Sequence, residues 1–182
     1  MAKIGIVIGS LRKESFSKKV AGNVAKLFPE GYTTELIEIG NLPLYNEEYD
    51  DNSPAEYTAF RSKVRAVNAI LFVTPEYNRS IPGVLKNALD VGSRPYGQSV
   101  WAGKPAAIIS HSIGNIGGFG ANHHLRQVLM FLDMPILQQP EVYLANTPKL
   151  FDEKGQINNA DTVKFLQSYV DAFGALIERY LA

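Results

Sequence analysis

The chain has 182 residues, of which 46% are hydrophobic and 20% are charged, a composition typical of one globular domain with its own core. Its 18 basic and 18 acidic residues cancel, so net charge favours neither nucleic acid nor an anionic membrane as a partner. Cysteine is absent, which excludes disulfides, thiolate catalysis and cysteine-bound metal or iron–sulfur centres.

Strands and helices are predicted to alternate along the chain. Runs that are apolar throughout predict inner strands of a parallel sheet, alternating polarity predicts an edge strand, and apolar residues three and four apart predict helices. Strands are predicted at 4–8, 33–39 (an edge strand), 70–73, 106–109, and either 136–137 or 142–144. Helices are predicted between and after them, at 18–28, 57–67, 84–90, 125–132 and 165–181. This order predicts a single α/β domain over residues 1–182, with right-handed crossovers.

A polar loop over residues 9–17 joins the first strand to the first helix. Such a loop presents unpaired N–H groups and the positive end of the helix dipole, which together suit an anion. Arg12 and the hydroxyls of Ser10, Ser15 and Ser17 add donors that suit a phosphate. The glycine patterns of the two common nucleotide loops are both missing. An ordinary helix start with Ser15 or Ser17 as N-cap explains the same residues, so both interpretations stay open.

Two further loops follow inner strands. Residues 74–83 contain two prolines, an aromatic and an amide, and could hold a flat heterocycle or form only a rigid surface loop. Residues 110–120 contain four glycines and several hydroxyls, and could approach a ligand closely or serve as a flexible connection. Since ligands of parallel sheets bind beyond the carboxyl ends of the strands, we expect all three loops to meet at one edge.

The sequence also gives expectations for the cellular location of the protein and for metal binding. The N-terminus runs straight into a strand, with no basic and long apolar segment before it, and no window approaches 18 apolar residues. We therefore expect a cytoplasmic protein without a signal peptide or a membrane span. Metal-ligand spacing is missing as well, so no metal site is expected. The adjacent His123 and His124 are assigned structural or surface roles.

The motifs resemble those of the NADPH-dependent FMN reductase family. The resemblance rests on Gly9-Ser10-Leu11-Arg12-x-x-Ser15-Phe16, on Pro75-Glu76-Tyr77-Asn78-x-Ser80-x-Pro82-Gly83-x-Leu85-Lys86-Asn87-Ala88-Leu89-Asp90, and on the later Gly103-Lys104-Pro105, Gly114-x-x-Gly117-Gly118 and His124-Leu125-Arg126-Gln127. It covers about residues 3–145 and is nearest to the bacterial chromate/quinone reductase and azoreductase-like branch. It implies a flavodoxin-like three-layer sandwich, with a five-stranded parallel sheet of order 2-1-3-4-5 and helices on both faces.

The resemblance also implies a cofactor site. One FMN would be bound per subunit, with NADPH or NADH as the electron donor and no catalytic side chain. The phosphate would be lined by Ser10, Arg12, Ser15, Phe16 and Ser17; the isoalloxazine ring by Pro75, Glu76, Tyr77 and Asn78; and the ring or ribityl chain by Ser110, His111 and Gly114. Two positions depart from the branch, which often has a small hydroxyl residue in place of His111 and commonly an Asn in place of Ser17. His111 could stack on the flavin or point to solvent.

The activity that the resemblance implies is NAD(P)H-dependent, ping-pong hydride transfer through FMN to quinones or related azo, nitro or chromate electrophiles. The alternatives are a flavin reductase that releases reduced FMN, and a non-enzymatic electron carrier or redox sensor. We expect a homodimer or homotetramer with no nucleic-acid or membrane partner. Aromatic residues near the predicted edge could wall the site or be ordinary surface residues: Tyr45, Tyr49, Tyr96 and Trp101.

Overall fold

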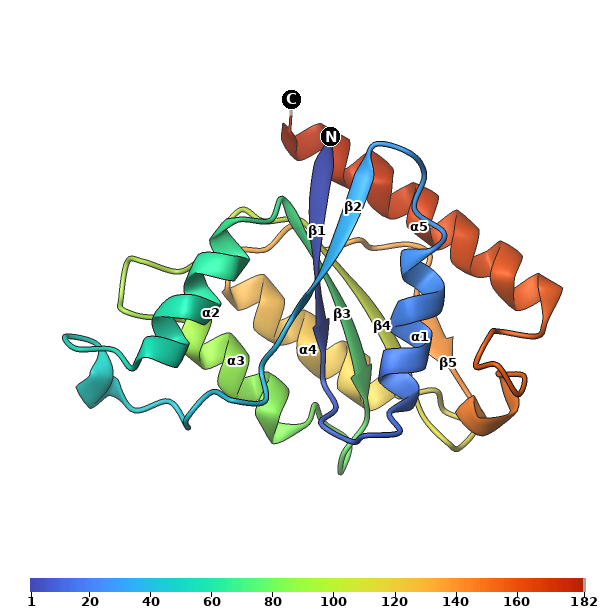
Figure 1. The fold of residues 1–182 in the computed structure, drawn as a ribbon, viewed down its shortest axis with the longest axis horizontal. Coiled ribbons are helices and arrows are strands. Elements are labelled where there is room, and N and C mark those ends of the chain that lie inside the picture. Colours follow the sequence, from blue (N-terminus) through green and yellow to red (C-terminus); the bar gives the residue numbers. More distant parts are fainter. Residues whose placement is uncertain (182) are drawn as a thin grey trace.

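The computed structural model describes residues 1–181 and contains one sheet of five parallel strands (Figure 1). The strand order β2-β1-β3-β4-β5 is the predicted one. The strands are β1 (Ala2–Ile8), β2 (Tyr32–Ile37), β3 (Ala69–Pro75), β4 (Ala106–His111) and β5 (Val142–Leu144). In register, Ile6 lies beside Leu36 of β2 and Leu71 of β3, so β1 is an inner strand and β2 is at the edge.

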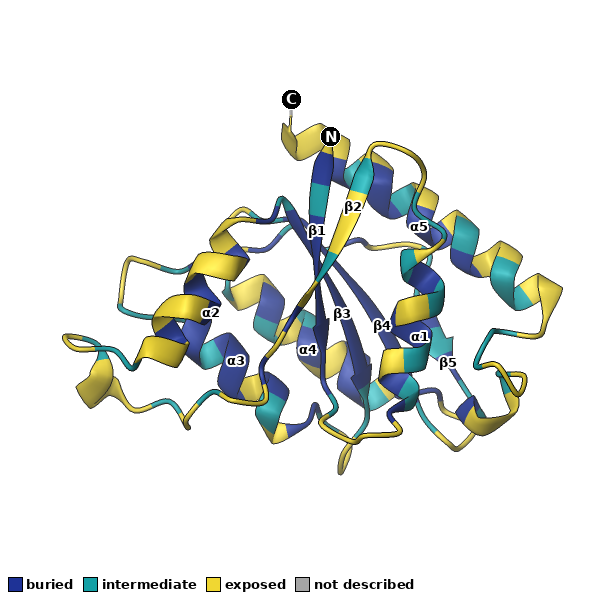
Figure 2. Cartoon of the chain, viewed as in Figure 1, coloured by how far each residue is buried: buried dark blue, intermediate teal, exposed yellow. Residues whose placement is uncertain are grey.

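Helices cover both faces of the sheet and complete the three layers. One face packs against α1 (Phe16–Ala25) and α5 (Ala160–Leu181), and the other against α2 (Ala55–Arg65), α3 (Gly83–Ser93) and α4 (Phe119–Phe131). Two short 3-10 helices, η1 (Glu47–Tyr49) and η2 (Thr147–Lys149), lie in connections. The inner strands are buried almost throughout, whereas β2 is largely exposed (Figure 2). Within the described residues, no helix has the length and apolar character needed to cross a bilayer.

The predicted strands and helices are all present, with ends shifted by a few residues. The alternative for the last strand is resolved in favour of residues 142–144, because Ile136 forms only an isolated bridge with Ala106. The first helix was predicted to begin at residue 18, but it begins at Phe16 with Ser15 as its N-cap. The Ser15 side chain accepts a hydrogen bond from the Lys18 N–H and so stabilises the helix at the edge where the strands end.

Trp101 lies in the hydrophobic core, so both alternatives predicted for it, a wall of the site and an ordinary surface aromatic, are wrong. Its ring is fully buried and packs against Phe60 and Phe72, and its indole N–H donates to the Leu89 carbonyl at 3.0 Å. For Tyr96, which is 90% exposed and does not line the cavity described below, the surface alternative holds.

Candidate functional site

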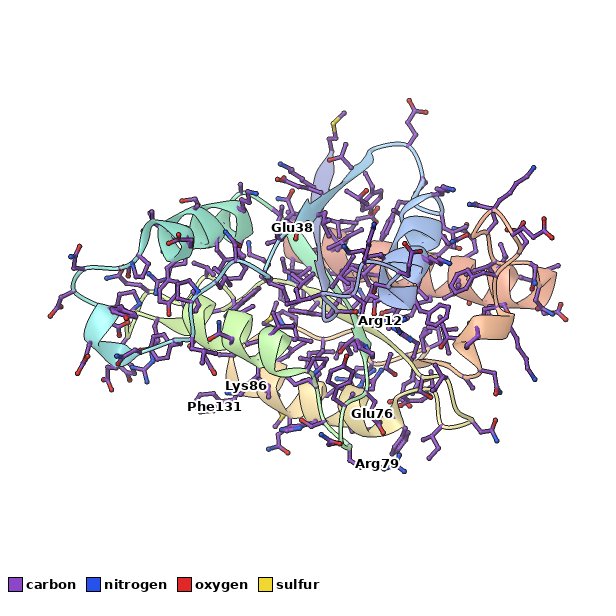
Figure 3. All side chains as sticks on the ribbon, turned by 60° about the horizontal axis from the view of Figure 1, so that its bottom comes forward. Arg12, Glu38, Glu76, Arg79, Lys86 and Phe131 are labelled. Atoms are coloured by element: carbon purple, nitrogen blue, oxygen red, sulfur yellow. The ribbon has the colours of Figure 1, made fainter. Side chains whose placement is uncertain are left out.

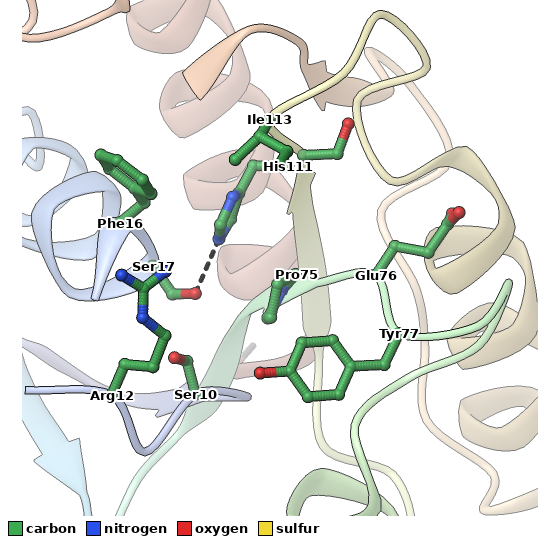
Figure 4. A pocket seen from close by; sticks show the side chains of 10 residues that line it. Ser10, Arg12, Phe16, Ser17, Pro75, Glu76, Tyr77, His111 and Ile113 are labelled. Carbon is green, nitrogen blue, oxygen red and sulfur yellow. Dashed lines mark hydrogen bonds between the residues drawn. The ribbon is translucent and has the colours of Figure 1, made fainter. Parts of the chain in front are cut away.

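A cavity of about 210 Å³ opens at the edge of the sheet where the strands end. Its lining comes from the three loops that follow β1, β3 and β4: Ser10, Arg12, Phe16 and Ser17; Pro75, Glu76 and Tyr77; and His111, Ser112 and Ile113. Figure 4 shows Arg12 and Ser17 on one side and Tyr77 on the other, with His111 between the loops. The predicted meeting of three loops at one edge is therefore confirmed.

The start of α1 supplies unpaired donors at this cavity. Ser15 accepts hydrogen bonds from two N–H groups of the first turn: its hydroxyl accepts from Lys18 N and its carbonyl from Lys19 N. The N–H groups of Phe16 and Ser17 have no partner within residues 1–181. The helix cap is confirmed, and it is compatible with the predicted anion site, because capping leaves the first two N–H groups of the helix available to a ligand.

Arg12 is the one cationic residue in the lining of this cavity as residues 1–181 form it, and its side chain is exposed there. Its guanidinium carbon lies 6.0 Å from the centre of the Phe16 ring. Phe16 is held in turn by stacking on Phe151, with ring centres 6.2 Å apart. Among the described residues no carboxylate forms an ion pair with Arg12, so its donors can pair with an anionic ligand.

The loop after β3 forms a tight hairpin that sequence reasoning did not anticipate. Tyr77 and Ser80 exchange two backbone hydrogen bonds of 2.9 Å, and the two residues between them adopt left-handed backbone angles (φ 50° at Asn78 and 63° at Arg79). The hairpin carries Asn78 to an exposed tip that does not line the cavity. Tyr77, half exposed, stays at the cavity rim.

Glu76 lines the cavity, but its carboxylate has partners elsewhere. One oxygen accepts from the Ala121 N–H at 3.1 Å and so caps α4, which begins after Gly118 without a side-chain cap of its own. The other accepts from Arg79 at 2.9 Å. In Figure 3, Glu76 and Arg79 lie together and apart from Arg12. The Glu76 side chain thus joins the second loop to the start of α4, and only its backbone and the aliphatic part of its side chain remain for a ligand.

The loop after β4 is held by its own hydrogen bonds. Ser110 is fully buried and donates to the Gly117 carbonyl at 2.9 Å, so its hydroxyl braces the loop and does not line the cavity. The Gly114 carbonyl accepts from Asn146 N at 2.9 Å, and Gly114 is also outside the lining. Gly117 has no room for a side chain, but the group that packs against it is the backbone of Tyr143 and not a ligand.

His111 lies beneath the cavity and is only 4% exposed, so the predicted solvent-facing alternative is wrong. Its Nε2 lies 2.7 Å from Ser17 Oγ and its Nδ1 lies 3.3 Å from Thr147 Oγ1 (Figure 4 draws the first bond). Burial lowers the pKa of His111 from 6.5 to about 4, so the ring is neutral at pH 7.

This buried histidine makes the fold sensitive to acid. Between pH 6.5 and about 4 the unfolded chain binds a proton at His111 that the folded chain does not, so stability is complete above this window and falls as pH drops through it. From pH 7 to pH 5 we expect a loss of about 2 kcal/mol from this group. Urea unfolding at both pH values should show a smaller loss in His111→Leu, whereas His124→Leu, which removes an exposed imidazole, should retain the wild-type loss. Equal losses in all three proteins would contradict this assignment.

Eight of the twelve residues predicted for the site line the cavity, and Ser15, Asn78, Ser110 and Gly114 do not. Sequence reasoning left out Ser112 and Ile113, which follow β4 directly and complete the lining. The hydroxyl of Ser112 was a usable signal, because it lies in the loop already singled out. Ile113 gave none: its position on the rim, 73% exposed, follows from the path of the loop.

A second hollow, of about 530 Å³, lies along α3 and α4 and is larger than the cavity at the sheet edge. Residues of these two helices form most of its lining, together with Tyr45 and Arg94. None of the three loops contributes to it. We assign the ligand site to the smaller cavity, because unpaired N–H groups, an unpaired guanidinium and an aromatic side chain converge there.

The donors at the sheet edge fit the FMN that the sequence resemblance implies. Arg12, Ser10 and the N–H groups of Phe16 and Ser17 provide positive potential and donors for a phosphate. At the other end, Pro75 and Tyr77 provide a rigid backbone and an aromatic surface for a flat ring. A cavity of this volume encloses only part of such a ligand, so one side of it would remain open.

Comparisons with known proteins agree with this reading. Residues 2–149 match the family model of NADPH-dependent FMN reductases. The chain is 53% identical to a quinone reductase of Pseudomonas putida, covering 96% of this chain and 94% of that protein. It is 47% identical to a 2-hydroxy-1,4-benzoquinone reductase of a Burkholderia species, covering 96% of both.

A solved structure shares the whole fold. It is FerB, a flavoenzyme NAD(P)H:(acceptor) oxidoreductase of Paracoccus denitrificans, which aligns over 99% of both chains with a TM-score of 0.93 and 37% identity. Fold, site and sequence therefore lead to one conclusion: the chain belongs to the NADPH-dependent FMN reductase family.

Proposed function

We propose that this protein is a cytoplasmic, FMN-dependent NAD(P)H oxidoreductase that reduces quinones. One observation carries the proposal: a single cavity joins phosphate donors at the start of α1 to an aromatic, backbone-rich end after β3. Membership of the family supports FMN and NAD(P)H. Relatives named as quinone reductases, similar over nearly the whole chain, support quinones as the acceptors.

The side chains would bind and orient, and the cofactor would supply the reaction. FMN, when bound, provides two-electron chemistry between a nicotinamide and an acceptor. Arg12 and the first N–H groups of α1 would hold the phosphate, and the hairpin of Tyr77 and Ser80 would fix the backbone beside the ring. Tyr77 and Ile113, both exposed at the rim, would provide apolar surface on which a flat nicotinamide and then a flat quinone could pack.

Anaerobic reduction in two stages tests this function. The purified yellow protein is mixed with NADPH or NADH, flavin absorbance is followed, and 1,4-benzoquinone is then added. We expect rapid bleaching by at least one nucleotide and rapid return of colour with the quinone, with the flavin still bound after gel filtration. A flavin that neither nucleotide bleaches would contradict the proposal and favour an electron carrier. Bleaching followed by loss of flavin from the protein would favour a flavin reductase. Azo, nitro and chromate compounds stay predictions that the same reoxidation assay can test.

We further propose that two copies associate through the α3–α4 face, defined as the lining of the second hollow together with Tyr96. Phe131 and Met130, at the end of α4, are 89% and 71% exposed, and Phe131 projects beside Lys86 (Figure 3). Lys86 and Asp90 on this face form an ion pair within one copy at 2.7 Å, so the interface need not bury either charge unpaired.

Replacing Phe131 with glutamate should therefore weaken the dimer, because a charge would have to be buried where an aromatic ring packs. We expect the dimer dissociation constant to rise by roughly tenfold or more. Phe165→Glu, the same change at an exposed position of α5, is the matched control and should leave the mass unchanged. Light scattering over a dilution series measures the mass and the dissociation constant of the wild-type protein and of each variant. A wild-type monomer, or equal effects of the two variants, would contradict an interface at this face.

A further inference from the structure

Ser17, His111 and Thr147 form a buried chain of hydrogen bonds below the cavity, and their exposed fractions are 0%, 4% and 0%. The Thr147 hydroxyl donates its only proton to the Ser112 carbonyl at 2.6 Å. Thr147 Oγ1 can therefore only accept from His111 Nδ1, which lies 3.3 Å away and must carry the ring proton. Because the ring is neutral, His111 Nε2 is an acceptor.

The acceptor at Nε2 decides the direction of the next bond. Ser17 Oγ lies 2.7 Å from Nε2, so the Ser17 hydroxyl donates its proton to His111. A serine hydroxyl has one proton, and in this arrangement it points away from any anion in the cavity. Ser17 nevertheless belongs to the first turn of α1, beside Arg12 and the unpaired N–H groups, where a phosphate would accept a donor.

We propose that His111 sets how strongly the pocket distinguishes a phosphorylated flavin from an unphosphorylated one, by holding the Ser17 hydroxyl proton. This proposal rests on the proposed function, since it presumes that the phosphate of FMN lies at the start of α1. His111 is a positioning residue: it withholds one donor from the phosphate, and the pocket then relies on Arg12, Ser10 and backbone N–H groups. The group that the pocket would recognise is the phosphate monoester, which FMN carries and riboflavin does not.

Affinities of the apoprotein for FMN and for riboflavin test the proposal without any activity measurement. The quantity compared is the riboflavin dissociation constant divided by the FMN dissociation constant. His111→Leu removes the acceptor, so the Ser17 hydroxyl can turn to the phosphate, and we expect this ratio to rise roughly tenfold. Ser17→Ala alone should leave the ratio within about twofold of the wild-type value, since no donor to the phosphate is lost.

The double variant Ser17→Ala/His111→Leu separates positioning from a general structural role. We expect it to lose the gain of His111→Leu, because that gain requires the Ser17 hydroxyl. Thr147→Val is a second route that keeps the imidazole: without its acceptor at Nδ1, the ring should move its proton to Nε2 and release Ser17, and the ratio should again rise. Nitrogen-15 spectra of the wild-type protein, which has three histidines, should show His111 protonated at Nδ1 and unprotonated at Nε2.

Three results would overturn the proposal. They are an unchanged ratio in folded His111→Leu and Thr147→Val proteins, a large loss of FMN but not riboflavin affinity in Ser17→Ala, and an Nε2-protonated or charged His111 in the wild-type spectrum. If the wild-type protein binds FMN no better than riboflavin, or binds neither, the site assignment under the proposed function fails instead. The two failures can therefore be told apart.

Discussion

Replacing Arg12 with alanine is expected to weaken FMN binding by roughly 10- to 100-fold and to leave the fold intact. A hydrogen bond to a charged partner contributes about 1.5–3 kcal/mol, and because Arg12 is exposed to water we expect the pair of bonds that its guanidinium can donate to contribute no more than one such bond. The Arg12 side chain is exposed and has no ion-pair partner among residues 1–181, so its removal costs the folded protein little.

The matched control for Arg12 is Lys13→Ala. It removes a positive charge from the next residue of the same loop, but Lys13 is exposed and does not line the cavity. We expect FMN affinity to change by less than about threefold in this variant, because distant surface charges are screened by salt. Riboflavin affinity should be unchanged in both. An Arg12→Ala protein that keeps wild-type FMN affinity, or loses riboflavin equally, would remove the phosphate from this end of the cavity.

Replacing Gly117 with alanine should destabilise the protein by about 3 kcal/mol and loosen the loop that follows His111 and carries Ile113. Gly117 has φ 63°, a left-handed backbone that costs a residue with a Cβ roughly 1–2 kcal/mol. A Cβ there would also lie 2.6 Å from the carbonyl carbon of Tyr143, and backbone atoms of a neighbouring strand cannot move away cheaply. The Ser110 bond to the Gly117 carbonyl would be strained as well.

Gly114→Ala is the control in the same loop. A Cβ at Gly114 would meet nothing within 4 Å, and we expect the free energy of unfolding to change by no more than about 0.5 kcal/mol. Urea unfolding of both variants measures the difference. If Gly114→Ala is as damaging as Gly117→Ala, glycine in this loop serves a ligand or general flexibility, and the close approach to Tyr143 is not the reason.

Much of the fold could be predicted because its signals are local. Inner strands such as residues 70–73 are apolar on both faces, and a sequence with strands and helices in alternation has few ways to bury them. Trp101 shows the limit of this reasoning. Its burial depends on space left by Gly92 and on the Leu89 carbonyl, both on α3, and no local pattern reveals that match.

The site was predictable in outline and less so in detail. The three loops were found because each follows an apolar strand, and parallel strands end at the same edge. The hairpin that exposes Asn78 was missed because its turn has Asn and Arg at positions where glycine is the usual signal. Likewise, the roles of Ser17 and His111 depend on a contact between residues 94 positions apart, which decides the direction of a hydrogen bond.

A crystal structure of the protein with FMN is the measurement that tests the central claim most directly. We predict the phosphate beside Arg12 and the N–H groups of Phe16 and Ser17, and the ring beside Pro75 and Tyr77, in the cavity formed by three loops. FMN bound instead in the larger hollow along α3 and α4, or a reversed FMN with its phosphate at Tyr77, would contradict this account.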